Sequence, residues 1–177
     1  MATVPGEIHD EHPFTDPEDQ RNPIRRFRGR LSAPVTIVTA GSQSSRTGLT
    51  VSSLVVAGDG EPKVHFVLGP ESYLWDAIQA SGRFVVHVLD ASQHALSDQF
   101  AGVRPSPGGP FTGLDVGDSS HGPLLESCST RAYCTLDSVV EGDGYLLVEG
   151  AIESVDLHDL TAPLQWFRGS YRTLAER

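Results

Sequence analysis

The sequence is poor in cysteine, in positive charge and in long apolar runs. No stretch approaches the roughly 18 consecutive apolar residues that a membrane-spanning helix needs, so we expect neither a membrane helix nor a membrane partner. The first ten residues, MATVPGEIHD, contain no basic segment followed by an apolar one, which predicts that there is no signal peptide. These absences favour a cytoplasmic protein.

Positive charge is scarce, because 13 Lys+Arg stand against 23 Asp+Glu and the formal net charge is -10. An acidic surface repels the phosphate backbone of nucleic acids and anionic lipids, so we expect no nucleic-acid partner. A site for an anionic ligand would therefore need its own local cluster of hydrogen-bond donors.

Only two cysteines are present, Cys128 and Cys134. The surrounding pattern predicts that both lie on one strand, where a rise of about 3.3 Å per residue would place them roughly 20 Å apart. That separation is too large for a disulfide. Since neither a CxxC pair nor histidines at zinc spacing accompany them, we expect two buried free thiols and no metal site.

The common catalytic and phosphate-binding signatures are missing. There is no GxxxxGK[ST], no GxGxxG after a strand, no GxSxG and no HExxH. We interpret His65 and His87 as strand residues and His94 as a helix residue, all with structural roles. His121 is the stronger functional candidate, because we expect it in an exposed loop. The residues alone assign no catalytic group.

Strand-like segments dominate the sequence from residue 35 onward. They cover residues 35–40, 47–58, 63–69, 83–89, 131–142, 144–155 and 163–174. Helical spacing occurs at residues 71–81 and 91–101, and a stretch rich in Gly, Pro and Ser at residues 102–123 predicts a long loop. The pattern predicts a mainly β protein, with a closed antiparallel sheet and a few short helices.

The N-terminal 20 residues hold six acidic residues and no Lys or Arg, whereas residues 21–30, RNPIRRFRGR, hold five arginines. We expect a flexible acidic arm over residues 1–20 and a single domain over residues 21–177. Ile24, Phe27 and Leu31 recur at helical spacing. This spacing predicts a short amphipathic helix that packs its apolar side on the domain and exposes its arginines.

The segment RTGLTVSS, residues 46–53, alternates like a strand but carries hydroxyls on both faces. One interpretation is an edge strand whose hydroxyls bond to neighbouring strands or to water. The other is a strand that presents hydroxyls and backbone amides to the phosphate and the flat ring of a ligand. The pattern alone leaves both interpretations open.

Several segments together resemble the flavin reductase-like, FMN-binding split-barrel family. They are APVTIVTA, RTGLTVSSLVV, VHFVLGPESYLWDAIQASGRFVVHVLDASQHALSDQFAG, FTGLDV and WFRGSYRTL, and the resemblance spans about residues 24–174. It implies a six-stranded antiparallel Greek-key split β-barrel that forms a homodimer with FMN near the interface. It also implies an NADH- or NADPH-dependent flavin reductase that passes reduced FMN, or FAD, to a partner monooxygenase.

The resemblance also implies where the cofactor binds. The segment matching the cradle of the flavin ring edge and phosphate consists of Thr50, Val51, Ser52 and Ser53. Leu68 and Gly69 match the strand end beside the ring. Ser72 matches a serine at a helix start that helps to hold the phosphate, where free N–H groups and the helix dipole favour an anion.

Three aromatic residues complete the implied site: Phe100 borders it, and Phe167 and Tyr171 match the closing strand near the nicotinamide. The chain also departs from the family pattern. Gly144 stands where reductases carry a histidine thought to contact the nicotinamide, and Pro110 stands where a lysine is common. The usual Thr-Gly before the first strand is replaced by Ala33-Pro34.

The leading hypothesis is hydride transfer from a nicotinamide to flavin N5, in which the cofactors carry the chemistry and the protein orients them. Arg168 or Tyr171 could orient the donor. The departures leave two alternatives: a flavin-binding carrier or partner protein without turnover, and a split-barrel protein that uses another planar cofactor, such as a deazaflavin or haem.

Overall fold

The structure of the chain is a computed structural model that describes residues 22–58, 60–160 and 162–174. The acidic arm predicted for residues 1–20 lies outside the described residues. In the part of the chain that is described, no helix has both the length and the apolar character to cross a membrane.

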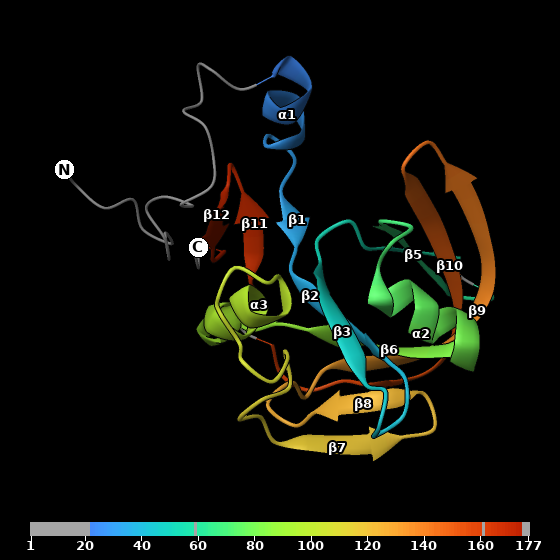
Figure 1. Cartoon of the computed structure of the whole chain (residues 1–177). Helices are drawn as coiled ribbons and strands as arrows, with labels where there is room; N and C mark the ends of the chain where they lie inside the picture. Colours follow the sequence, from blue (N-terminus) through green and yellow to red (C-terminus); the bar gives the residue numbers. More distant parts are fainter. Residues whose placement is uncertain (1–21, 59, 161, 175–177) are drawn as a thin grey trace.

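The main sheet has seven strands in the order β3-β2-β6-β9-β10-β5-β4 (Figure 1). Every pair in it is antiparallel. Its strands in chain order are β2 (Thr36–Ala40), β3 (Thr47–Val51), β4 (Val55–Ala57), β5 (Lys63–Leu68), β6 (Arg83–Val88), β9 (Arg131–Gly142) and β10 (Tyr145–Asp156). The predicted mainly β, antiparallel architecture is confirmed.

The two edges of this sheet, β3 and β4, are consecutive parts of one predicted strand. Residues 52–54 turn the chain away from β2 and bring it beside β5 at the opposite edge. One bent strand therefore closes the sheet into a barrel. Counted this way, the barrel has the six strands that were predicted, although the prediction of a continuous strand over residues 47–58 was wrong.

Two smaller sheets flank the barrel. One has the order β1-β11-β12 and is formed by β1 (Ala33–Pro34), β11 (Gln165–Phe167) and β12 (Ser170–Arg172). The other is a hairpin of β7 (Val116–Ser119) and β8 (Gly122–Leu125). This hairpin corrects the prediction of a loop over residues 102–123. Its composition is poor for strands, but Thr39 donates a hydrogen bond to the Pro123 carbonyl over 2.7 Å and fixes it against β2.

The two predicted helices are present as α2 (Tyr73–Ser81) and α3 (His94–Phe100), the latter preceded by the 3₁₀ turn η2 (Ala91–Gln93). The Ser72 hydroxyl caps α2 by accepting a hydrogen bond from the Leu74 amide over 3.2 Å. Gly82 ends α2 in the left-handed conformation, with φ 68°. Leu74 and Ile78 bury one face of α2 in the barrel core, as their spacing predicted.

The helix α1 (Pro23–Arg28) also forms, but its predicted docking on the domain is wrong. Ile24, Phe27 and Leu31 are exposed by 75%, 66% and 56%, and Figure 1 shows α1 beyond β1, clear of the barrel. A helix of six residues has too little apolar surface to hold itself in place. Its neighbouring residues fix it instead, through backbone bonds described below.

The strand β2 separates two apolar cores and is buried along its whole length. Val38 and Ala40 face the barrel interior with Phe66 and Phe84. Ile37 faces a second core, which is formed with residues such as Val35, Leu89, Phe100, Phe111 and Tyr171. The alternation of β2 therefore binds α3 and the β1-β11-β12 sheet to the barrel.

Both cysteines are buried and unpaired, as predicted. Only Cys134 belongs to β9, whereas Cys128 precedes that strand, so the prediction of one common strand was wrong. Burial raises the pKa of Cys128 to about 11 and that of Cys134 to about 12. Both thiols are thereby kept protonated and unreactive at neutral pH.

The imidazole of His87 on β6 is fully buried. Its Nδ1 lies 3.2 Å from the Ile37 carbonyl oxygen, and its Nε2 accepts a hydrogen bond from the Leu125 amide over 3.2 Å. Desolvation, with a smaller contribution from the charge of Arg131, lowers the pKa of His87 to about 3, against the effect of the Ile37 bond. The folded protein therefore holds a neutral imidazole.

We expect this histidine to make stability depend on pH. In the unfolded chain its pKa is about 6.5, so between pH 3 and 6.5 the unfolded state binds more protons. The free energy of unfolding should fall below pH 6.5 by up to about 1.4 kcal/mol per pH unit from this group. Urea unfolding at several pH values checks this, because His87→Gln should have a shallower pH slope than the wild type; equal slopes would contradict the assignment.

Candidate functional site

A groove of about 720 Å³ opens where the bent strand leaves the sheet. Its walls come from α1, from β3 and the bend, from β5 and from the β11-β12 hairpin. The lining residues are Arg25, Arg28, Gly29, Leu31, Ala33, Leu49, Thr50, Val51, Ser52, Ser53, Val67, Trp166 and Gly169. Four of the predicted cofactor-binding residues, 50–53, thus line one groove of the size that cofactor sites usually have.

The hydroxyls of this segment have different partners. Thr50 donates to the Ser97 carbonyl of α3 over 2.7 Å. Ser53 accepts a hydrogen bond from the Val67 amide over 2.9 Å and lies 3.4 Å from the Val67 carbonyl oxygen, so it ties the bend to β5. Ser52 is exposed and makes no hydrogen bond to the described residues. The interpretation as bonds to neighbouring elements therefore holds for Thr50 and Ser53, whereas a ligand contact of the row stays a prediction.

The backbone of the bend offers further donors. Residues 52–54 lie outside the pairing of both β3 and β4, and their amides have no backbone partner among the described residues. Successive amides that leave a strand form a concavity suited to anions or to carbonyl oxygens.

Apolar side chains complete the walls. Leu49, Val67 and Trp166 line the groove, and the Trp166 ring is held edge-on against Tyr171, with ring centroids 5.0 Å apart. Neither Trp166 nor Val67 was among the predicted site residues. The strand alternation that buries Leu68 turns its neighbour Val67 outward, so alternation was the available signal for Val67.

Arg25 and Arg28 also line the groove. The sequence interpretation placed these arginines on a solvated face, and both are indeed exposed, but their face is also a wall of the site. The reversal of charge at residues 21–30 was the signal that could have identified them.

Three further predicted residues, Leu68, Gly69 and Ser72, do not line the groove. Leu68 is buried in the barrel core at the end of β5. Gly69 follows it in the turn before α2, with its carbonyl accepting from the Ser72 amide over 3.1 Å. The Ser72 hydroxyl already caps α2. Their contact with a cofactor stays a prediction.

The three predicted aromatic residues are placed differently from one another. Phe100 is buried against Phe111, with ring centroids 5.0 Å apart. Tyr171 is buried; its hydroxyl donates to Asp98 Oδ1 over 2.7 Å and lies 2.9 Å from Ser97 Oγ, and desolvation raises its pKa. Phe167 is half-buried next to Trp166. The groove lining includes none of the three.

His121 is not the exposed loop residue that the sequence suggested. It lies in the tight turn between β7 and β8 with a side chain only 12% exposed, and its Nε2 is 2.7 Å from Glu153 Oε2 on β10. Gly144 lies in the β9-β10 turn with φ 76°, and no heavy atom lies within 4 Å of the position of a Cβ. A histidine at position 144 would have room but an unfavourable backbone.

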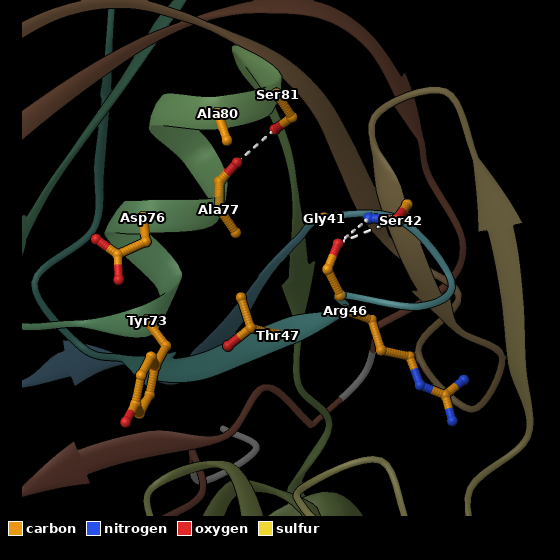
Figure 2. Close-up of a pocket in the computed structure, with 10 residues that line it drawn as sticks. Gly41, Ser42, Arg46, Thr47, Tyr73, Asp76, Ala77, Ala80 and Ser81 are labelled. Carbon is orange, nitrogen blue, oxygen red and sulfur yellow. Dashed lines mark hydrogen bonds between the residues drawn. The ribbon is translucent and has the colours of Figure 1, made fainter.

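A second cavity, of about 690 Å³, lies between α2 and the β2-β3 hairpin (Figure 2). Small side chains and hydroxyls line it, together with Tyr73 and the carboxylate of Asp76. Figure 2 shows Arg46 extending away from α2, and its guanidinium lies 5.1 Å from the centre of the Phe111 ring. This cavity contains none of the predicted site residues, so we place the site in the first groove.

The lining of the first groove combines apolar surface, neutral donors and positive charge. Trp166, Leu49 and Val67 are the apolar part, Ser52 and the amides of residues 52–54 are the neutral donors, and Arg25 and Arg28 carry the positive charge. This donor set is compatible with a flat ligand that has an anionic group. Among the described residues there is no group of three or more His, Cys, Asp or Glu side chains that could hold a metal ion.

Comparisons with known proteins agree with this geometry. The family model described as "Flavin reductase like domain" matches residues 28–175. The reductase subunit of a flavin-dependent monooxygenase from Mycobacterium tuberculosis is 33% identical over 153 residues, which is 84% of this chain and 79% of the relative. An NADH-dependent FMN reductase from Streptomyces nodosus subsp. asukaensis is 33% identical over 174 residues, or 95% and 91% of the two chains.

A solved structure extends the likeness to three dimensions. The crystal structure of nitrilotriacetate monooxygenase component B from Mycobacterium thermoresistibile matches with a TM-score of 0.78 and 28% identity, and the match covers 86% of this chain and 85% of that one. Together with the barrel and its donor-lined groove, these matches confirm the predicted family: the chain belongs to the flavin reductase-like domain family.

Proposed function

We propose that the chain reduces FMN with NADH in the groove at the strand bend. The observation that carries the proposal is that residues 50–53, Trp166 and two arginines line one groove. The relative from Streptomyces nodosus, which is named an NADH-dependent FMN reductase, supports FMN and NADH, while a relative from Streptomyces globisporus is named an NADH-dependent FAD reductase and keeps FAD as the alternative flavin. The site is assigned to the domain that we place over residues 21–177.

The residues of the chain bind and orient rather than react. Trp166 and Val67 would offer apolar surface to a flat ring system, and the Ser52 hydroxyl and the bend amides would donate to its polar edge. Thr50 and Ser53 keep the bend in shape through α3 and β5. A flavin held there would supply the hydride-accepting chemistry, so these residues would need to provide no acid or base for the hydride transfer itself.

We also propose that the protein is a homodimer. Leu147 on β10 pairs with Val67 on one side and Val140 on the other, so the three side chains share one face of the sheet. They are exposed by 37%, 43% and 60%. An apolar row of this kind favours a protein contact, and a second copy of the chain would bury it next to the groove. The mass from sedimentation equilibrium tests this: the mass of a single chain at micromolar concentration would refute it.

We propose that the partner is a monooxygenase that consumes the reduced flavin, because two of the similar proteins are named as parts of monooxygenases. The cytoplasmic location expected from the sequence stays a prediction.

The test is a flavin-binding titration followed by NADH oxidation. We expect FMN to bind and NADH to be oxidised faster in the presence of protein than with FMN alone, with lower rates for FAD and for NADPH. FMN binding without NADH oxidation would favour the carrier alternative. Failure to bind FMN or FAD, with a deazaflavin or haem spectrum in the purified protein, would refute the flavin assignment.

A further inference from the structure

We propose that Arg25 and Arg28 of α1 bind a phosphate group of a ligand in the groove. The inference rests on the proposed function and deepens it, since it assigns an anion-binding role to a helix outside the barrel. The chemical class of the bound group is a phosphate ester or a pyrophosphate, which FMN and NADH respectively carry.

The charge of the groove is opposite to that of the protein. The net charge of the chain is -10, yet the groove is lined by two arginines and by no aspartate or glutamate among the described residues. In an acidic protein, such a local pair of cations is what draws an anionic ligand to one place.

Backbone hydrogen bonds hold Arg25 and Arg28 at the groove, although α1 packs no apolar side chains against the domain. The Gly29 carbonyl at the end of α1 accepts a hydrogen bond from the Arg168 amide over 3.1 Å. Arg168 adopts φ 53°, a left-handed conformation that is uncommon for a residue other than glycine. The turn between β11 and β12 is thus shaped to meet the end of α1.

A second tie lies just beyond the helix. Ala33 pairs with Trp166 in the β1-β11 ladder, and Ser32 Oγ donates to Gln165 Oε1 over 3.2 Å. Trp166 is itself a wall of the groove. The arginines and the aromatic wall are therefore parts of one connected unit.

The spacing of the arginines suits a phosphate. Residues three apart on a helix lie on the same side, with their Cβ atoms about 5–6 Å apart. Each guanidinium presents a planar fork of donors that matches two phosphate oxygens. Arg26 and Arg30 are not among the lining residues. The same short segment therefore has two arginines that line the groove and two that do not.

This arrangement supplies a matched control. The double variant Arg25→Gln/Arg28→Gln removes two charges from the groove, whereas Arg26→Gln/Arg30→Gln removes two charges from the same segment outside it. Flavin fluorescence titration with FMN and with riboflavin gives the dissociation constants, and NADH titration gives KM. Thermal unfolding of both variants shows whether the fold is retained, because Arg25 and Arg30 each already take part in an interaction.

We expect the groove variant to lose about 10- to 100-fold in affinity for the phosphate-bearing ligand, and the control variant to lose less than about 3-fold. If the flavin phosphate is bound, Kd for FMN rises and Kd for riboflavin does not. If the nicotinamide pyrophosphate is bound, KM for NADH rises while Kd for FMN stays the same. Either result supports the inference.

The inference is overturned if the two double variants behave alike, or if riboflavin loses as much affinity as FMN and KM for NADH is unchanged. The outcome is separable from that of the proposed function, because the flavin titrations require no turnover. A protein that binds FMN through these arginines without oxidising NADH would retain the inference and lose the reductase assignment.

Discussion

Replacement of Ser52 by aspartate should abolish flavin binding at concentrations that saturate the wild type. Ser52 is exposed in the bend, and its hydroxyl has no partner among the described residues. A carboxylate here would turn a donor into an acceptor and would set a charge without a donor against the acceptor atoms of the ring edge. A charged group left without a partner costs about 3 kcal/mol, so we expect Kd for FMN to rise at least about 100-fold.

Ser52→Asn is the control for this variant, because asparagine has the shape of aspartate without its charge. We expect Ser52→Asn to weaken FMN binding by less than about 10-fold and both variants to unfold at the same urea concentration as the wild type. Fluorescence titration measures the binding. Equal loss by the two variants would mean that the bend is too crowded for any larger residue, and unchanged binding by Ser52→Asp would place the flavin elsewhere.

Among the substitutions considered, replacement of Gly150 by alanine should cause the largest fall in the free energy of unfolding. Gly150 lies on β10 at a shift in the pairing with β9. A Cβ at this position would lie 2.3 Å from Phe84 Cζ and 3.2 Å from the Thr135 carbonyl oxygen. Phe84 is fully buried and packs edge-on against Phe66, with ring centroids 5.4 Å apart. The ring therefore cannot move without disturbing the barrel core.

We expect Gly150→Ala to lower the free energy of unfolding by about 2–3 kcal/mol, the usual cost of overpacking a core. Gly60→Ala is the matched control, since no heavy atom lies within 4 Å of its added Cβ, and it should change stability by less than about 0.5 kcal/mol. Urea unfolding measures both. If the cause is the clash with the ring, Phe84→Leu should be less harmful in the Gly150→Ala background than alone. Additive losses would exclude that contact as the cause.

The sequence predicted the elements that depend on local pattern. The strands β2, β5, β6, β9 and β10 and the helix α2 follow from alternation, helical spacing and the Ser72 cap. These features are formed by neighbouring residues, so they can be identified before any partner is known.

The missed features depend on residues far away in the chain. The segment at residues 47–58 has the composition of one strand. Its first part pairs with β2 and its last part pairs with β5, so the chain bends at residues 52–54 between them. The β7-β8 hairpin forms from GPLL and VGDS because β2 holds it. No local property of these residues distinguishes a bend or a hairpin from a strand or a loop.

The same reason limited the prediction of the site. Residues 50–53 were predicted from the resemblance, whereas Arg25, Val67 and Trp166 belong to segments that meet only in the folded chain. The charge reversal and the strand alternation mark Arg25 and Val67 as unusual, but neither signal shows that α1, β5 and β11 border one groove.

The closure of the barrel by one bent strand has a consequence for how the protein is made. The hairpin β2-β3 and the hairpin β4-β5 are local, but in the sheet they are separated by β6, β9 and β10. Because β5 pairs with β10 through residues as late as Ala151, a growing chain cannot complete the sheet until that part has left the ribosome. Contacts this distant in sequence form slowly. The strands of the first half therefore keep unpaired edges until β10 is available. The groove at the strand bend forms only in the last stage of folding.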